Sequence, residues 1–234
     1  MSAFKCLGCG KPNGITDAPN MMAARLAKLI RCPDCAAKAE REEQDHQHER
    51  QAEHLRLRLL TLPRELRDVR AAKSPAPRSA VDAAWKWAGQ GGGLMLVGPV
   101  GTGKTYLAAA AVRHMMRDRD VTWQSVPSML TLAVAAFDDE GRKQAVRAIT
   151  GRSALVLDDL DKMKPSEWTA AQLYAAIDNR VTSGAPLLVT ANKTPAQLAS
   201  HVGGEFGKAI ASRLAGYCHV VECDGSDVRL RVVS

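Results

Sequence analysis

The segment Gly98–Thr105 reads GPVGTGKT and satisfies the pattern G-x-x-x-x-G-K-[S/T]. It lies between an apolar stretch that we expect to form a strand, Leu94–Val97, and an Ala-rich stretch that we expect to form a helix, Lys104–Met116. This context favours a phosphate-binding loop, because glycines let backbone N–H groups surround phosphate oxygens and a helix N-terminus carries partial positive charge. The expected nucleotide-binding residues are Gly98, Pro99, Val100, Gly101, Thr102, Gly103, Lys104, Thr105 and Tyr106.

Two side chains of this loop have separate expected roles. Lys104 is expected to reach the β- and γ-phosphates of ATP, because its ammonium group is a compact positive charge on a long stem. Thr105 is expected to supply a hydroxyl oxygen to Mg²⁺.

A second element of the same site is predicted at Ser153–Asp161, which reads SALVLDDLD. Four apolar residues lead to Asp158 and Asp159 at the carboxyl end of a strand, where ligands bind in open α/β sheets. We expect Asp158 to hold Mg²⁺ and Asp159 to activate the attacking water, although adjacent carboxylates also occur in surface turns. Asn192 follows another predicted strand and could orient the water, although an Asn in that position is also an ordinary turn residue.

Short apolar runs alternate with helical stretches from Thr61 onward, which is the pattern of an α/β domain with a parallel sheet. The expected strands are Leu94–Val97, Val121–Ser125, Leu155–Leu157, Leu187–Thr190 and His219–Val221. The expected helices are Lys104–Met116, Pro127–Thr150, Ser166–Ser183 and Glu205–Leu214. Ser166 is expected as an N-cap, Gly216 as a C-cap, and residues 71–79 as a Pro-rich surface loop. The sequence therefore predicts an α/β fold with a five-stranded parallel sheet.

Two CxxC pairs with 22 residues between them stand near the N-terminus, namely Cys6, Cys9, Cys32 and Cys35. Two such pairs can close a tetrahedral shell of thiolates around one zinc ion, which would be structural because no coordination position stays open. The same cysteines could instead form a redox dithiol or two disulfides. Cys218 and Cys223 lie near the last predicted strand and are expected to be buried thiols.

The chain is therefore divided into three expected parts: residues 1–35 as a zinc-binding module, 36–60 as a linker helix and 61–234 as the ATPase domain. The stretch 36–60 is charged and contains neither Gly nor Pro. Its leucines do not keep a heptad register, so a solvated linker helix is favoured over a coiled coil.

Composition excludes several classes of protein. The 234 residues are 46% hydrophobic and 24% charged, which is typical of a globular protein and not of a disordered or collagen-like chain. No apolar run approaches the roughly 18 residues of a membrane span, and no signal peptide opens the chain, so we expect a cytoplasmic protein without a membrane partner. The net charge of +7 permits contact with nucleic acid, but it is equally compatible with a solvated surface.

In this order, the motifs GPVGTGKT, LVLDDLD, SEWTAAQLYAAIDNRVTSGAPLLVTAN and ASRLAG resemble those of the AAA+ ATPases of the bacterial replicative helicase loader family, of DnaC and DnaI type. Transposition helper ATPases of IstB type share the pattern. The resemblance covers about residues 60–231. It implies that Asn192 is the sensor 1 residue, Arg213 an arginine finger that enters the neighbouring subunit's site, and Arg229 the sensor 2 residue. It also implies that Leu62–Arg70 borders the adenine and that no C-terminal lid domain follows. The implied catalytic residues are Lys104, Asp159, Asn192 and Arg213.

One residue departs from the family pattern. Asp161 stands where the family often has Gly, after Asp158 and Asp159. A third acid at this place either alters the affinity for Mg²⁺ or faces solvent, and the sequence leaves both alternatives open.

The resemblance implies an ATP-dependent loader that places a hexameric replicative helicase on single-stranded DNA and is switched by ATP at a subunit interface. In such loaders the region before the ATPase contacts the helicase, so the zinc module is expected to dock the helicase or else to contact nucleic acid. The alternative is an IstB-type helper that remodels DNA for a transposase. A small-molecule kinase that acts as a monomer and a zinc-stapled nucleic-acid-binding protein with a degenerate ATPase also stay open.

A basic cluster could form the expected surface for single-stranded DNA. Its residues are Arg142, Lys143, Arg147 and Arg152, with Phe137 as one ring for base stacking. A solvated basic face is an equally good interpretation.

Overall fold

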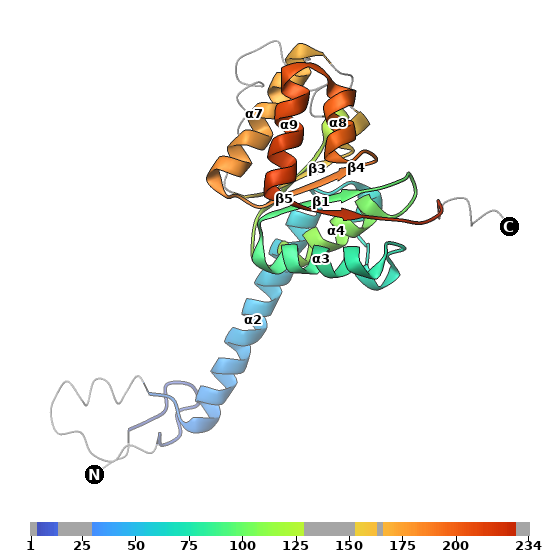
Figure 1. Ribbon diagram of the computed structural model, residues 1–234. Helices are drawn as coiled ribbons and strands as arrows, with labels where there is room; N and C mark the ends of the chain where they lie inside the picture. The colour runs from blue at the N-terminus through green and yellow to red at the C-terminus, as the bar shows by residue number, and fades with distance from the viewer. Residues whose placement is uncertain (1–3, 14–29, 129–152, 163–165, 228–234) are drawn as a thin grey trace. The chain divides into compact units, whose positions relative to one another are not determined.

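The computed structural model describes residues 4–13, 30–128, 153–162 and 166–227 (Figure 1). The chain forms two compact units, Met1–His54 and Leu55–Ser234. The boundary between them falls inside helix α2 (Pro33–Leu59), which contains almost all of the stretch expected to be a linker helix. No residue of this helix is fully buried, although Leu55 and Leu59 at its C-terminal end pack against the core of unit Leu55–Ser234. Local pairs such as Lys38–Glu42, 3.7 Å apart, support its exposed part.

Unit Leu55–Ser234 contains a sheet of five parallel strands in the order β2-β3-β4-β1-β5. The strands are β1 (Gly93–Val97), β2 (Val121–Ser125), β3 (Ala154–Asp158), β4 (Leu187–Ala191) and β5 (Cys218–Glu222). All five lie where the sequence predicts them, and the α/β fold class is confirmed. Strands β1, β3 and β4 are apolar runs that are buried on both faces, whereas the edge strands β2 and β5 include polar and more exposed residues.

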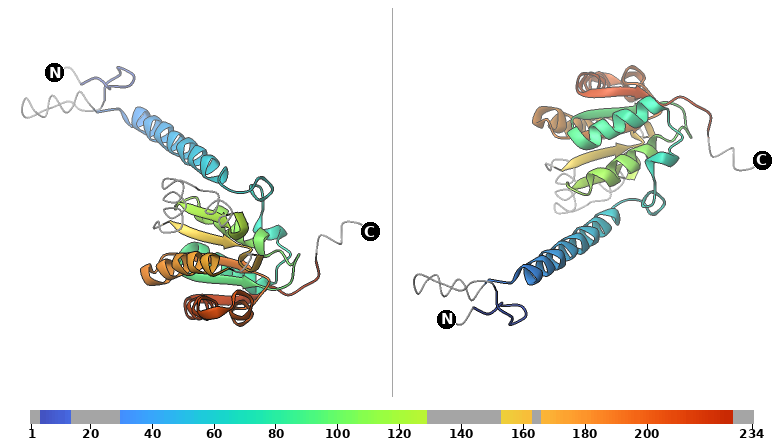
Figure 2. Two further views of the ribbon diagram at one scale, coloured as in Figure 1. Left: turned by 90° about the horizontal axis from the view of Figure 1, so that it is seen from above. Right: turned by 90° about the horizontal axis from the view of Figure 1, so that it is seen from below.

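Helices cover both faces of this sheet (Figure 2). Helices α3 (Arg78–Gln90) and α4 (Lys104–Met115) pack on one face, and α7 (Glu167–Ser183), α8 (Pro195–Val202) and α9 (Gly204–Tyr217) pack on the other. Alternate residues of β1 pack against the two groups of helices, because successive side chains of a strand point to opposite faces. Leu94 and Leu96 pack with α3 and α4, whereas Met95 and Val97 pack with the other three helices.

The register of the strands brings their carboxyl ends to one edge of the sheet. Val97, the last residue of β1, pairs with Ala191 of β4. Leu157 of β3 pairs with Val189 of β4, so Asp158 stands level with Thr190. The phosphate-binding loop, Asp158 and Asn192 therefore follow neighbouring strand ends.

The predicted helices at α4, α7 and α9 are present, and Ser166 is the N-cap of α7, where its side chain accepts a hydrogen bond from Thr169 N. The prediction of Gly216 as a C-cap was wrong. Gly216 lies inside α9, which continues to Tyr217 and passes directly into β5, so the helix ends without a turn that needs glycine. Most of the predicted helix Pro127–Thr150 lies outside the described residues.

Helices α3 and α8 were not predicted. Residues 71–79, expected to be a loop, contain a 3₁₀ turn at Ala71–Lys73 and the start of α3. The buried residues of α3 are Ala80, Ala84, Trp87 and Ala88, and this helical spacing is a signal that could have located the helix. Helix α8 begins with a capping box in which Thr194 accepts from Gln197 N, and this spacing is a signal that could have located it. Among the described helices, none is long and apolar enough to cross a membrane.

Candidate active site

The phosphate-binding loop connects β1 to α4 in a conformation that requires glycine. Gly98 has a φ of 140°, and a Cβ there would lie 2.4 Å from the carbonyl oxygen of Cys223. Gly103 caps α4 in the left-handed region, with a φ of 86°. Thr102 Oγ1 closes the loop by donating to the carbonyl oxygen of Pro99 at 2.9 Å. The loop is therefore held in a cradle that side chains larger than glycine would fill.

Lys104 is buried at the centre of this loop. Its Nζ donates to the carbonyl oxygens of Gly98 and Pro99, both at 2.7 Å, and to Asn192 Oδ1 at 3.1 Å. Burial lowers the pKa of Lys104 from its ordinary value, although the negative charges of Asp161 and Asp159 oppose this shift. The ammonium group stands where it can contact phosphate oxygens bound at the loop.

A hydroxyl and a carboxylate lie side by side at the start of α4 and the end of β3. Thr105 Oγ1 donates to Asp158 Oδ1 at 2.9 Å, and Thr190 Oγ1 donates to the same oxygen at 2.6 Å. Burial raises the pKa of Asp158, and these two hydrogen bonds oppose the shift. Oxygen donors of this kind fit Mg²⁺, which prefers carboxylate and hydroxyl ligands. Thr190 was not singled out in the sequence; it could have been found as the β4 residue level with the first acid.

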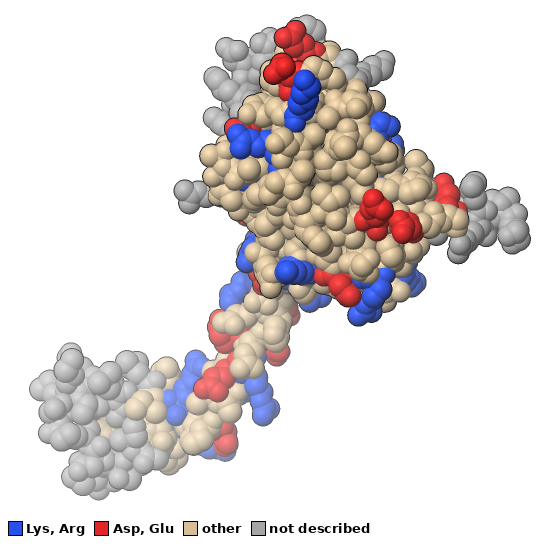
Figure 3. All heavy atoms as spheres, viewed as in Figure 1, with Lys and Arg blue, Asp and Glu red and all other residues tan. Residues whose placement is uncertain are grey.

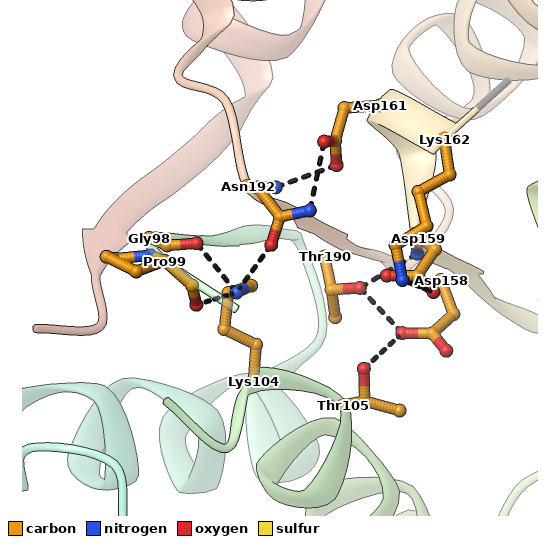
Figure 4. Close-up of polar contacts among 10 residues, drawn as sticks. All are labelled: Gly98, Pro99, Lys104, Thr105, Asp158, Asp159, Asp161, Lys162, Thr190 and Asn192. Atoms are coloured by element: carbon orange, nitrogen blue, oxygen red, sulfur yellow. Dashed lines mark hydrogen bonds and ion pairs between the residues drawn. The ribbon is translucent and has the colours of Figure 1, made fainter. Parts of the chain in front are cut away.

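Asp159 has an unusual backbone conformation. Its φ is 59°, the one positive φ among the described non-glycine residues. Its backbone N–H donates to Thr190 Oγ1 at 3.0 Å, and its Oδ2 pairs with Lys162 Nζ at 2.7 Å. Strain of this kind costs on the order of 1 kcal/mol and persists where neighbours hold the residue in place. The turn aims the carboxylate of Asp159 into the site, and Lys162 restrains it there (Figure 4).

Asp161 does not face solvent, so one of the two alternatives for this residue is excluded. Its carboxylate is buried and accepts two hydrogen bonds from Asn192, one from the backbone N at 2.7 Å and one from Nδ2 at 3.0 Å. Figure 4 shows the amide of Asn192 between Asp161 on one side and Lys104 on the other.

A cavity of about 770 Å³ opens beside these groups. Its wall includes Lys104, Thr105, Tyr106, Asp158, Asp159 and Asn192. Pro63, Glu65 and Leu66 also line it, from the segment that the resemblance implies at the adenine. This segment is tied to α4, because Arg70 N donates to the hydroxyl of Tyr106 at 3.1 Å. A volume of this size suits a nucleotide.

Trp123 and Ser125 of β2 line the same cavity and were not predicted. Trp123 is buried, and its Nε1 donor has no hydrogen-bond partner within the described part of the chain. The sequence gives no signal for these two residues, because the segment that forms β2 matches no catalytic or nucleotide-binding motif.

Arg213 lies on α9 and does not line the cavity of its own chain. Its guanidinium pairs with Asp178 Oδ1 of α7 at 2.8 Å, and a hydrogen bond with Tyr174 raises the pKa of Arg213. The structure therefore does not bring Arg213 to Lys104. Arg229 lies outside the described residues.

The basic cluster at 142–152 and Phe137 also lie outside the described residues. On the face of unit Leu55–Ser234 seen in Figure 3, most of the surface is uncharged. Charges of both signs are scattered over it and do not gather into a basic surface on this face.

The four N-terminal cysteines form a candidate metal centre. Their sulfur atoms all lie within 4.8 Å of one another, and 3.8 Å separates the sulfurs of Cys9 and Cys32. Four thiolates about 2.3 Å from a tetrahedral zinc ion would be roughly 3.8 Å apart. All four cysteines are free, so the structure does not contain the two disulfides that the sequence left open as an alternative to zinc.

Backbone donors point at one of these sulfurs. Gly8 N and Cys32 N donate to Cys6 Sγ at 3.3 and 3.1 Å. These hydrogen bonds, with that from Cys32 first, lower the pKa of Cys6 to about 6. Four thiols, one of which receives two backbone N–H donors that favour its ionised form, fit the donor set of a zinc site. Cys218 and Cys223 are buried as expected, and burial raises the pKa of Cys218 to about 12.

Comparison with known proteins identifies the family of this chain. The sequence family described as IstB-like ATP-binding protein matches residues 36–234. An ATP-binding protein of an insertion sequence in Mycobacterium tuberculosis is 31% identical over 155 residues, which are 64% of this chain and 60% of the relative. An IS21-like insertion-sequence ATP-binding protein of Bacteroides fragilis is 25% identical over 62% of this chain and 56% of its own length. The chain thus spans about three fifths of the length of these curated relatives.

Solved structures support the fold. The crystal structure of DnaI has a TM-score of 0.59 at 22% identity and covers 71% of this chain and 93% of that one. The crystal structure of the DnaC helicase loader has a TM-score of 0.57 at 18% identity and covers 69% of this chain and 100% of that one. At these identities the likeness establishes a shared AAA+ fold, and function must be argued from the site.

Proposed function

Because this chain belongs to the family of IstB-like ATP-binding proteins, we propose that it hydrolyses ATP and uses the cycle to load a replicative DNA helicase onto single-stranded DNA. The observation that carries the loader proposal is a four-cysteine cluster that precedes the family match. The match begins at residue 36, and the cluster occupies Cys6 to Cys35. The chain therefore combines an ATP site with a second module that is suited to docking a partner.

The proposed reaction is attack of a water oxygen on the γ-phosphorus of ATP, with cleavage of its bond to the β–γ bridging oxygen. Thr105 and Asp158 would hold Mg²⁺, which would neutralise part of the phosphate charge when bound with ATP. Lys104 neutralises the β- and γ-phosphate oxygens, and the backbone N–H groups of the loop orient them. ADP and inorganic phosphate are the products.

Asp159 is the proposed acceptor of the water proton. Lys162 contacts its Oδ2, and the remaining acceptor sites of the carboxylate can take a hydrogen bond from the water. Asn192 lines the same cavity and is proposed to help position the water.

Arg213 is the proposed arginine finger of a neighbouring subunit. Its side chain is 45% exposed and stands on a helix that does not line its own cavity, as a residue that acts in trans requires. A guanidinium offers two parallel donors to the charge that spreads over the γ-phosphate during hydrolysis. ATP turnover would then report self-association, and assembly would switch the enzyme on.

The four-cysteine module is the proposed docking element for the hexameric helicase in the cytoplasm. A zinc ion held by Cys6, Cys9, Cys32 and Cys35 would stabilise a segment too small to fold around its own core. Contact with single-stranded DNA is proposed for the assembled ATPase units, where binding should weaken as the salt concentration rises.

The test is a pull-down of purified hexameric replicative helicases by the full-length protein, with ATP, ADP or no nucleotide. Capture that depends on nucleotide and is lost in Cys32→Ser supports a loader with a docking module. Capture unchanged by Cys32→Ser contradicts the docking role of the module. Failure with every helicase, by a protein that does hydrolyse ATP, overturns the loader proposal.

A second candidate function is that of a transposition helper. It is favoured by the two curated relatives, which are both ATP-binding proteins of insertion sequences. Its test is ATP-dependent capture of an IS21-type transposase on DNA by the same protein. Capture of the transposase together with failure to bind helicase would establish the helper in place of the loader.

A further inference from the structure

We propose that Asp161 is a positioning residue that sets which atom of the Asn192 amide faces the phosphate site. The inference deepens the proposed ATP hydrolysis and rests on it. Asp161 is the residue that departs from the family pattern.

Asn192 donates two hydrogen bonds to the carboxylate of Asp161. Asp161 lies in the 3₁₀ turn Leu160–Lys162, directly after the two acids of β3, and is 8% exposed. Its Oδ1 accepts from the backbone N of Asn192 at 2.7 Å, and its Oδ2 accepts from Nδ2 at 3.0 Å. The side chain of Asn192 is thus held at two points by the same group.

The second contact of the amide lies on the opposite side. Asn192 Oδ1 accepts from Lys104 Nζ at 3.1 Å. A side-chain amide has two orientations that differ by a half turn, and its oxygen and nitrogen exchange places between them. The opposite orientation would set Oδ1 against the carboxylate of Asp161 and the Nδ2 donors against the ammonium of Lys104. Asp161 and Lys104 therefore favour the same orientation of the Asn192 amide. The opposite orientation would be much less stable, because the amide oxygen would then face a buried carboxylate.

The consequence concerns the chemistry of Asn192. One Nδ2 hydrogen of Asn192 is bonded to Asp161 and Oδ1 faces Lys104, so the amide presents its acceptor to Lys104 or to the attacking water. The second Nδ2 hydrogen is the donor that this orientation leaves for a phosphate oxygen, which is itself an acceptor. Asn192 and Lys104 line the cavity, whereas Asp161 is not among the described residues that line it. Asp161 therefore acts through Asn192 and touches no reacting atom.

The experiment exchanges the two partners. Asp161→Asn replaces one of the two accepting oxygens by an NH₂ group, so one of the two contacts to Asn192 becomes donor against donor. Asn192→Asp sets two carboxylates against each other. In the double variant, the new amide at 161 can donate to the new carboxylate at 192, whose other oxygen still faces Lys104. We expect each single variant to lower kcat by at least about 10-fold with a KM change within roughly 3-fold, and the double variant to recover most of the loss. The matched control is Asp118→Asn, an exposed carboxylate outside the site, which should leave both constants unchanged.

A second measurement uses the wild-type protein and does not depend on turnover. The side-chain amide of Asn192, assigned by NMR through its loss in Asn192→Asp, should exchange with solvent at least about 10-fold more slowly than the amide of a free Asn peptide, because a buried carboxylate accepts from it. Rapid exchange overturns the geometry on which the proposal rests.

The outcomes separate this inference from the proposed function. Normal kcat in Asp161→Asn, with wild-type ATP hydrolysis intact, overturns the inference alone. Loss of kcat and of thermal stability in the single variants, without recovery in the double variant, assigns Asp161 to folding and also overturns it. A wild-type protein that hydrolyses no ATP overturns the proposed function and, with it, the role of Asp161 in turnover.

Discussion

Arg213 of α9 and Asp178 of α7 form an ion pair, with 2.8 Å between Nη2 of the guanidinium and Oδ1 of the carboxylate. Both side chains are partly exposed, at 45% and 33%, and neither lines the cavity that holds Lys104. The pair sets the direction of the guanidinium while leaving it open to a second molecule. An arginine needed for hydrolysis at this place has to serve a neighbouring site.

The first prediction is trans-complementation. Arg213→Ala keeps its own phosphate loop but deprives its neighbour of the finger, whereas Lys104→Ala does the reverse. Each variant alone should turn over ATP poorly, and an equimolar mixture should regain activity, because roughly one quarter of randomly formed interfaces would combine two intact halves. Steady-state ATP hydrolysis measures this. Lys208→Ala, an exposed cation on the same helix, is the matched control and should keep full activity. A mixture no more active than its components would contradict a finger in trans.

The second prediction follows from the buried ammonium of Lys104. Burial lowers the pKa of this lysine, so it loses its proton at a lower pH than an exposed lysine does. Only the protonated form attracts phosphate, so the affinity for ATP should fall as the pH rises through this lowered pKa. Binding of a fluorescent ATP analogue between roughly pH 7.5 and 10 measures the effect.

Lys104→Arg is the control for this pH dependence. Arginine stays protonated throughout the range, so the variant should bind with an affinity that depends little on pH, whatever its absolute value. An equally steep alkaline loss in Lys104→Arg would assign the titration to another group.

The third prediction concerns metal removal. Purified protein should contain about one zinc ion per chain, and chelation or Cys32→Ser should remove it. Cys6 and Asn13 are the buried side chains among the described residues of unit Met1–His54, so this unit should lose its fold without metal. Limited proteolysis should then cleave the N-terminal region, while nucleotide binding by unit Leu55–Ser234 persists. Cys218→Ala, at a buried thiol outside the cluster, should retain the full zinc content.

The fourth prediction tests the loop geometry. Gly98→Ala places a Cβ 2.4 Å from the carbonyl oxygen of Cys223, at a φ of 140° that side chains rarely adopt. We expect a loss of about 1–3 kcal/mol in the free energy of unfolding and at least about 10-fold weaker ATP binding. Gly216→Ala is the control, because that glycine lies inside α9 with open space around it, so the change should be neutral or stabilising. Normal ATP binding by Gly98→Ala would show that the loop tolerates a Cβ.

Local patterns predicted much of this protein. The phosphate loop needs glycines, a lysine and a hydroxyl within one short segment, and its flanking strand and helix can be recognised from apolar spacing. Strands β1, β3 and β4 were predicted for the same reason, because each is a nearly continuous apolar run, whereas β2 and β5 mix apolar with polar residues. Helix α3 was missed even though its buried residues Ala80, Ala84, Trp87 and Ala88 recur at helical spacing.

The sequence by itself determined that a nucleotide loop, two acids and four paired cysteines exist in this chain, because each is written in neighbouring residues. Only the tertiary structure decided which distant groups complete them. Thr190 contacts Asp158 because β4 pairs with β3, and Asp161 holds Asn192 because their two strand ends meet at one edge of the sheet. Such contacts depend on strand order and register, which are set by the packing of the whole sheet between its helices and not by any short segment.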